Sequence, residues 1–207
     1  MTEARKRGRP AAGSGPDQRE RILAVARQHL AAKGFAGSSL RAIAREAGVD
    51  PSLIGHYFGD KAGLLVATMQ LPFNPLEKIL PVLASDVEGL GVRLVTTFLG
   101  AWDPHRDVFS ALLRSTFGSG DPAAMPAVQV AQNIVVKGLQ AKLSGPDADI
   151  RATLAASQVI GMATLRYVAR LEPMASAPAD LVARWYGPAI QELLTPPASA
   201  EPASAEG

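Results

Sequence analysis

The stretch from Ser38 to Leu65 constrains the fold more than any other part of the chain, and it reads SSLRAIAREAGVDPSLIGHYFGDKAGLL. Ser38 and Ser39 precede an apolar pattern of helical period, and hydroxyl side chains at such a place cap free backbone amides. The apolar and small residues that recur at this spacing are Leu40, Ile43, Ala44 and Ala47. The pattern predicts a short helix with one buried face.

A tight turn and a second helix follow this pattern. Gly48 stands where the chain must reverse, and glycine adopts the positive φ of such a turn without steric cost. Asp50 and Pro51 suit the cap and the first residue of a helix, and Ile54 and Phe58 return to the core. A turn of about three residues between two short helices indicates a helix-turn-helix. A helical hairpin that only packs is the alternative, but it does not explain the glycine, the cap pair and the aromatic ending together.

The second helix of this motif is predicted to enter the major groove of DNA. With Ile54 facing inward and about 100° of rotation per residue, Ser52 and His56 point outward. His56 can donate to a base edge, and Lys61 can bind a phosphate. The residues of this motif that we predict to contact DNA are Ser38, Ser39, Arg41, Pro51, Ser52, Gly55, His56, Tyr57 and Lys61.

Residues 17–70 resemble the DNA-binding domain of the tetracycline-repressor (TetR) family of transcription regulators. The matching run extends without a gap from Arg19 to Leu65 and reads RERILAVARQHLAAKGFAGSSLRAIAREAGVDPSLIGHYFGDKAGLL, with a lysine-glycine-phenylalanine turn and an HYF-x-x-K ending. Many members carry an aromatic residue where this chain has Gly55. The resemblance therefore implies that His56 and Tyr57 carry more of the DNA contact here.

The first 16 residues are polar, rich in glycine and proline, and predicted to be a disordered basic arm. Such an arm can lie in the minor groove beside the major-groove site, or it can be a solvated tail. The arm residues that we predict to contact DNA are Arg5, Lys6, Arg7 and Arg9. Residues 1–70 hold 11 Lys and Arg against 6 Asp and Glu, a charge of +5, whereas residues 71–207 hold 10 against 13, a charge of −3. This asymmetry favours nucleic-acid binding by one end of the chain.

Helical periodicity continues through most of the remaining chain, so we expect an all-α protein of two domains. The two prolines Pro72 and Pro75 interrupt the pattern and mark the domain boundary. Residues 17–70 are thus predicted to form the helix-turn-helix domain and residues 71–195 a helical bundle, with a low-complexity tail over 196–207. The resemblance implies that this bundle binds an effector, that it dimerises, and that the helix after the motif links the two domains.

The helix expected over Ile150–Leu171 carries no charge between Arg151 and Arg166. A helix that is apolar or small on all sides is buried on both sides, and one side can face the core of its own bundle. A second copy of the chain would cover the other side, as in family members that dimerise through their last two long helices; a short element of the same chain is the alternative. The predicted dimer residues are Leu154, Ser157, Gly161, Leu165, Leu181 and Trp185.

The resemblance implies a ligand cavity in the bundle, and aromatic residues at helical spacing are available to line it. The same spacing also suits plain core packing. The predicted ligand-binding residues are Phe98, Trp102, Phe109, Leu113, Phe117 and Met162, with Gln132 and Gln158 as polar anchors. Because the inward faces of the predicted bundle helices carry few charged residues, we expect an effector that is mostly apolar and near neutral.

Several classes of protein are disfavoured by the sequence. There is no cysteine, no HExxH or GxSxG motif and no glycine-rich phosphate loop, so we expect neither an enzyme nor a metal or cofactor site. No apolar run reaches the roughly 18 residues of a membrane span, and the basic N-terminus lacks the apolar segment of a signal peptide, which together favour a cytoplasmic location. His29 is expected at a partly exposed position of the first helix.

These features predict a homodimeric regulator that binds a pseudo-palindromic operator on double-stranded DNA and leaves it when a small effector binds. Two alternatives remain open. One is an architectural DNA binder that recognises charge rather than sequence. The other is a small-molecule-binding or protein-interaction bundle that has lost operator recognition.

Overall fold

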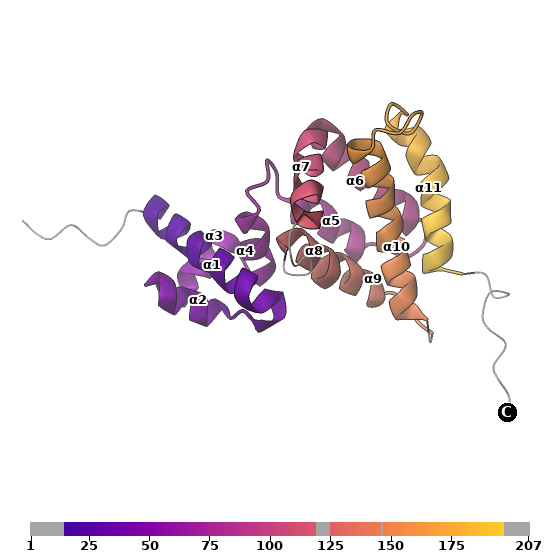
Figure 1. Cartoon of the computed structure of the whole chain (residues 1–207). Helices are drawn as coiled ribbons and strands as arrows, with labels where there is room; N and C mark the ends of the chain where they lie inside the picture. The colour runs from indigo at the N-terminus through magenta and orange to yellow at the C-terminus, as the bar shows by residue number, and fades with distance from the viewer. Residues whose placement is uncertain (1–14, 119–124, 146, 197–207) are drawn as a thin grey trace, which may run out of the picture.

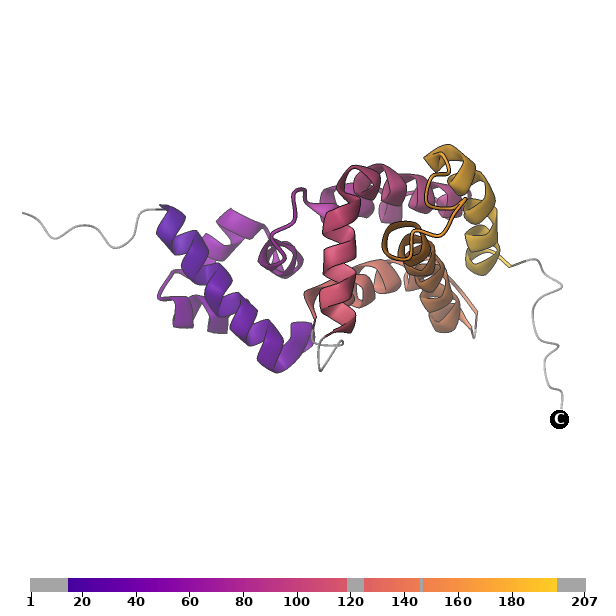
Figure 2. The same cartoon turned by 45° about the horizontal axis from the view of Figure 1, so that its top comes forward.

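We describe the protein from a computed structural model, in which residues 15–118, 125–145 and 147–196 are placed well enough to describe. All regular elements in these ranges are helices. Helices α1 to α4 gather at one end of the molecule, and α11 lies at the other (Figure 1). A second view keeps the same separation (Figure 2). The all-α prediction is confirmed.

The N-terminal group contains the predicted helix-turn-helix. Its helices are α1 (Gly15–Gly37), α2 (Leu40–Ala47), α3 (Pro51–Phe58) and α4 (Lys61–Thr68). Helix α1 is interrupted at Gly34, whose φ of 65° and ψ of −177° are not helical. Gly48 ends α2 in the left-handed conformation, with φ 65° and ψ 39°, as the turn requires. One hydrophobic cluster of this group is formed by the buried residues Ile22, Leu23, Ala26, Ile43, Ala44, Ala47, Ile54 and Leu64.

The C-terminal group forms a second hydrophobic cluster, which extends from Val66 to Leu194. Its helices before the first gap in the described ranges are α5 (Pro75–Ala84), α6 (Leu90–Trp102), the short 3-10 helix η1 (Asp103–His105) and α7 (Arg106–Phe117). After it come α8 (Pro126–Val130), the π-helical segment η3 (Ala131–Val136), α9 (Lys137–Gln140), α10 (Ala148–Ala163), the π-helical segment η4 (Thr164–Val168) and α11 (Ala179–Leu194).

The two groups touch through the linker 69–74 and through α8. Helix α8 packs against both α1 and α4, and α4 also contacts α5. At this contact, the buried side chain of Gln129 on α8 lies 3.8 Å from the position of a Cβ at Gly34. The bundle therefore touches both the helix that supports the motif and the helix that follows it.

Helices α6 and α11 make the closest crossing in the bundle. A Cβ at Gly91 would overlap the carbonyl oxygen of Gly187, so the two backbones pass with no room for a side chain at the crossing. The side chain of Gln191 joins both sides, because its Oε1 accepts from the Gly91 amide at 2.9 Å and its Nε2 donates to the Val87 carbonyl at 2.9 Å. This crossing fixes α11 on the bundle.

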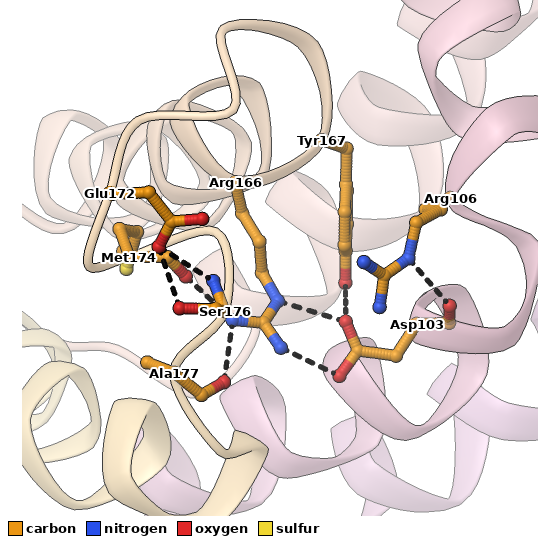
Figure 3. Close-up of polar contacts among 8 residues, drawn as sticks. All are labelled: Asp103, Arg106, Arg166, Tyr167, Glu172, Met174, Ser176 and Ala177. Carbon is orange, nitrogen blue, oxygen red and sulfur yellow. Dashed lines mark hydrogen bonds and ion pairs between the residues drawn. The ribbon is translucent and has the colours of Figure 1, made fainter.

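A buried polar network fixes the far end of α10 (Figure 3). Arg166, in η4, donates from Nε and Nη2 to the two carboxylate oxygens of Asp103 at 2.8 and 3.0 Å. Its Nη1 donates to the carbonyls of Met174 and Ala177 at 2.7 and 2.9 Å, which holds the connection between α10 and α11. The Tyr167 hydroxyl donates to the same Asp103 carboxylate at 2.9 Å.

The network shifts the pKa of its members. Burial opposes ionisation of the Asp103 carboxyl, but the hydrogen bonds from Arg166 and Tyr167 outweigh it and lower the pKa of Asp103. Hydrogen bonding to Asp103 raises the pKa of Arg166, and burial with the same carboxylate raises the pKa of Tyr167. The pair is therefore ionised, and Tyr167 is neutral, at any ordinary pH.

Candidate nucleic-acid interface and effector cavity

Helix α3, which the sequence predicts to enter the major groove, begins with a well-formed cap. The Asp50 side chain accepts from the Ser52 amide at 2.8 Å and from the Ser52 hydroxyl at 2.5 Å, and these bonds lower the pKa of Asp50. Pro51 occupies the first helical turn, where its missing amide hydrogen costs nothing. Ile54 is fully buried and anchors the opposite face of the helix. The cap and the anchor set which side of α3 faces outward.

The outward side of α3 is open to solvent, as predicted. Ser52, Gly55 and His56 are exposed, and Tyr57 is half-buried with its ring against that of His56, the ring centroids 5.3 Å apart. No atom lies within 4 Å of a Cβ built at Gly55, so the surface has space for a larger side chain there. Arg41 on α2 and Pro51 are also exposed. Arg41, Ser52 and His56 are thus polar residues that the fold leaves exposed to solvent.

Lys61 is placed beside the last residues of α1, after its break at Gly34. Its ammonium lies over the Phe35 ring, 4.6 Å from the ring centroid, and its Nζ donates to the Ala36 carbonyl at 3.5 Å. In the free protein it thus contacts the end of α1, whereas the sequence predicts that it binds DNA.

The two serines before α2 behave differently from the expected caps. Ser39 is the N-cap residue in extended conformation, but its side chain makes no cap hydrogen bond. Ser38 is 4% exposed, and its hydroxyl donates to the Gly34 carbonyl at 2.7 Å. The break in α1 at Gly34 frees that carbonyl, and Ser38 satisfies it. The burial of Ser38 and this hydrogen bond argue against the predicted DNA contact of its side chain, whereas Ser39 is exposed.

His29 is also placed differently from the expectation. It is 8% exposed, and its Nε2 lies 2.8 Å from Oε2 of Glu46 on α2. Its position, three residues after the buried Ala26, puts it on the apolar stripe of α1. The ring therefore packs between α1 and α2 and is not a surface group. The predicted arm residues Arg5, Lys6, Arg7 and Arg9 lie outside the described residues.

The C-terminal helices surround a cavity of about 250 Å³. Its walls come from the linker, α5, α6, α7, α8, η3, α9 and α10. The predicted residues that line it are Phe98, Trp102, Phe109, Leu113 and Phe117. Three of them form an aromatic cluster, with ring centroids 5.4 Å apart for Phe98 and Phe109 and 4.8 Å apart for Trp102 and Phe109.

Three predicted ligand residues lie elsewhere. Gln132 and Gln158 are exposed and line no part of this cavity, so the structure contradicts their role as polar anchors. Gln158 is four residues after Leu154 and shares its exposed face, and Gln132 lies in the π-helical η3, where the wider turn shifts the register. Met162 is 1% exposed in the surrounding core and does not line the cavity.

The linker and α5 contribute to the cavity, which the sequence did not lead us to expect. Met69, Leu71 and Phe73 line it, and so does Lys78 on α5. The one available signal was the pair of prolines, Pro72 in the linker and Pro75 at the start of α5, which prevents α4 from continuing as one long helix. A cavity wall made by the linker places any bound molecule against the connection to the DNA-binding helices.

The opposite side of α10 exposes apolar residues among small and polar ones. Leu154 and Leu165 are 42% and 39% exposed, and Trp185 on α11 is 74% exposed. Ser157 and Gly161 lie between them on α10 and are exposed, and a Cβ at Gly161 would meet no atom within 4 Å. Leu181 is half-buried. All six predicted dimer residues therefore lie on helices whose outer side nothing in the described chain covers completely.

Two kinds of feature are missing from the part of the chain that the structure describes. No group of three or more His, Asp or Glu side chains among residues 15–118, 125–145 and 147–196 is arranged to hold a metal ion. Within the same ranges, no helix is long and apolar enough to cross a membrane.

Comparison with known proteins covers both parts of the chain. Residues 22–68 match the family model of bacterial regulatory proteins of the tetR family, and residues 88–194 match the tetracyclin repressor-like C-terminal domain. A TetR-family regulator from Streptomyces coelicolor A3 has a similar structure, with a TM-score of 0.50 and 38% sequence identity, over 91% of this chain and 99% of that chain.

Curated relatives match over about a third of the chain. The transcriptional regulator BetI of Ectopseudomonas mendocina is 43% identical over 61 residues, which are 30% of this chain and 31% of that protein. BetI of Stenotrophomonas maltophilia is 35% identical over 69 residues, 33% of this chain and 35% of that protein. The chain thus spans about a third of the length of these curated relatives.

Proposed function

The chain belongs to the TetR family of DNA-binding transcription regulators, and from this premise we propose that it is a homodimeric repressor that leaves its operator when a small, mostly apolar molecule fills the C-terminal cavity. The observation that carries this proposal is the wall of the cavity. Met69, Leu71 and Phe73, which connect the DNA-binding helices to the bundle, line the cavity directly.

The DNA contact is proposed for the exposed side of α3. Its N-terminal end carries Ser52, and His56 stands one turn further along the same side. Ser52 and His56 can reach base edges in the major groove, whereas Lys61 and Arg41 are better placed for phosphates. A regulator of this design binds two half-sites about one helical turn apart, because two recognition helices enter successive major grooves.

The dimer is proposed to form through the uncovered side of α10 and α11. An apolar patch this exposed is unusual for a monomer and typical of a protein–protein interface. The glycine and serine between Leu154 and Leu165 would let the partner's helix approach closely. A two-fold dimer built on this surface would carry its DNA-binding helices as a pair, which a pseudo-palindromic operator requires.

Release of the operator follows from the position of the cavity. A molecule in the cavity touches the linker and α8, and α8 packs against both α1 and α4. If binding favours one arrangement of these elements over another, it changes the spacing of the two recognition helices in the dimer. The effector therefore lowers DNA affinity only to the extent that it binds more tightly to the arrangement that does not fit the operator than to the one that does.

The experiment that tests this proposal is selection of bound sequences from a random duplex library at about 150 mM salt, with the wild type, His56→Ala and Lys61→Ala. We expect a pseudo-palindrome for the wild type. His56→Ala should relax the base preference at one position of each half-site. Lys61→Ala should weaken binding to all sequences and should reduce the slope of log K against log [salt] by about one, as expected for the loss of one phosphate contact. Binding without an enriched motif that vanishes as salt rises would instead indicate a non-specific architectural protein.

A further inference from the structure

We propose that the effector is an amphipathic anion: an apolar body of about ten non-hydrogen atoms inside the cavity, with a single carboxylate-like head at Lys78. This inference rests on the proposed function, since it names the chemical class that the same cavity takes. It also replaces the expectation of a near-neutral effector with one that carries a charge at one end.

The interior of the cavity offers almost nothing to a polar group. Among the side chains that line it, only Lys78, Thr97, Thr116 and the indole of Trp102 carry nitrogen or oxygen atoms, and the rest are apolar. The Thr116 hydroxyl already donates to the Leu112 carbonyl of its own helix at 2.8 Å. Burial of a ligand atom that needs hydrogen bonds is therefore unfavourable over most of the cavity wall. The body of the ligand must therefore be apolar.

The single charged side chain of the lining is a cation at the edge of the cavity. Lys78 lines the cavity and is exposed, whereas Leu76 two residues before it is buried, so the Lys78 side chain connects the cavity wall with water. No hydrogen bond or ion pair of Lys78 occurs within the described ranges. A negative head at this edge would gain an ion pair without leaving water entirely.

The element that carries Lys78 adds to the preference for an anion. Helix α5 begins at Pro75, and both Pro75 and Leu76 line the cavity, so the first turn of the helix, where the helix dipole is positive, borders the same region; the Leu76 amide itself is capped by the Asn74 side chain at 3.1 Å. The nearby carboxylate of Glu77 accepts from the Asn74 side chain at 3.2 Å and is not part of the lining. No acidic side chain of the described residues lines the cavity. A cationic ligand would therefore lose its hydration shell and gain only contacts with aromatic ring faces in return.

The size of the cavity bounds the length of the apolar body. An apolar cavity of about 150 Å³ holds benzene, which corresponds to roughly 25 Å³ for each carbon atom. By the same ratio, the cavity of about 250 Å³ holds about ten non-hydrogen atoms. A medium-chain carboxylate such as octanoate or decanoate matches both the size and the charge.

The test compares three probes with similar tails, namely decanoate, decanol and decyltrimethylammonium, by isothermal titration calorimetry with the DNA-free protein. Decanoate should bind most tightly. Lys78→Met should weaken decanoate binding about two- to fivefold, as expected for a solvent-exposed ion pair, and leave decanol binding unchanged. Lys78→Glu should reverse the order of decanoate and decyltrimethylammonium. Salt should weaken the binding of decanoate and not that of decanol.

The matched control is Lys137→Met, which removes an exposed lysine of the same domain that pairs with Asn133 and does not line the cavity. This variant should bind all three probes as the wild type does. Equal affinities for decanoate and decanol, unchanged binding by the Lys78 variants, or tightest binding of the ammonium probe by the wild type would each overturn the proposal.

DNA binding provides a separate readout, measured on the sequence selected from the library. If decanol binds and releases DNA while decanoate does not bind, the anion inference fails and the proposed function stands. If decanoate binds through Lys78 but releases no DNA, the ligand class stands and the proposed repressor mechanism fails.

Discussion

Helix α10 has two apolar sides that meet very different surroundings. On one side Ala155, Ala156, Val159 and Ile160 line the cavity inside the bundle. On the other side Leu154, with Leu165 in the adjoining η4, is partly exposed, and α10 packs beside α11. On both sides, apolar groups are packed less closely than in a well-packed hydrophobic core.

The difference between the two sides indicates what each one can accept. The inner side bounds a void of limited volume, so only a small molecule fits there. The outer side is open and extends over two helices, so only another macromolecular surface can cover it. A single helix thus lies between the proposed effector site and the proposed dimer interface. Variants on one side of the helix should therefore affect ligand binding, and variants on the other side should affect dimerisation.

The largest effect is expected at Arg166, because its ion pair with Asp103 holds the end of α10 on which both the cavity side and the outer side depend. Arg166→Met should lower the free energy of unfolding by about 3–5 kcal/mol, because the part-buried Asp103 carboxylate loses its ionic partner. Urea denaturation measures this change. Arg170→Met is the control, since it removes an exposed ion pair with Asp107 and should cost less than about 1 kcal/mol. Similar losses for the two variants would show that the network does not anchor α10.

The same network predicts a dependence on pH. Because the pKa of Asp103 is lowered in the folded protein, its stabilisation is present above the unfolded value of about 3.9 and is lost as the pH falls through the lower folded value. The difference in stability between the wild type and Asp103→Asn should therefore be constant from about pH 5 to 7 and should shrink below about pH 4. A difference that grows on acidification would contradict this sign.

The outer side is tested by Leu154→Asp. A charge in an apolar interface should raise the dimer dissociation constant at least about 100-fold, while the protomer, in which this position is 42% exposed, keeps its fold. Size-exclusion chromatography with light scattering across a dilution series measures it. The control is Ala111→Asp on an exposed position of α7. Equal effects of the two variants would place the interface elsewhere.

The inner side is tested by Ala156→Leu, which adds three carbon atoms to the wall of the cavity. Filling the void should stabilise the protein by about 1 kcal/mol and raise Tm by about 2–4 °C. It should also reduce the affinity for a cavity ligand while leaving the dimer intact. Differential scanning calorimetry with and without decanoate measures both changes, and a ligand-induced shift as large as that of the wild type would argue against binding at this wall.

The smallest effect is expected from alanine substitutions at two glycines that have similar surroundings in the protomer. Gly55 and Gly161 both lie in helices, and an added Cβ at either position would meet no atom within 4 Å. Alanine at either should therefore stabilise its helix by about 0.5–1 kcal/mol. Gly161→Ala should in addition weaken the dimer, because the partner would pack against this position. Thermal unfolding at high and low protein concentration separates the two; identical concentration dependence would exclude Gly161 from the interface.

The helix-turn-helix could be predicted from the sequence because its signals are local. The left-handed glycine at Gly48 and the cap pair of Asp50 and Pro51 act within a few residues, and the structure has all three in the expected roles. Ser38 was misplaced because its partner is a carbonyl released by the break at Gly34, which its own position in the sequence does not reveal.

The cavity could be predicted only in part, because it depends on how distant helices meet. Helical period placed Phe98 and Trp102 on the inner side correctly, but it failed at Gln132, where η3 departs from 3.6 residues per turn. The contribution of the linker and Lys78 depends on how α4 and α5 sit on the bundle. That arrangement arises from long-range packing, which periodicity within one segment does not encode.

Whether a second copy of the chain covers the outer side of α10 and α11 decides how the molecule can act, and sedimentation equilibrium of the wild type measures this. The chain has a mass of 21.6 kDa, so we expect a species of twice that mass at micromolar concentration. Leu154→Asp under the same conditions should sediment as the single chain. A wild type that stays at 21.6 kDa up to the highest measurable concentration would contradict the proposed dimer, because a monomer could not present paired recognition helices to a two-fold operator.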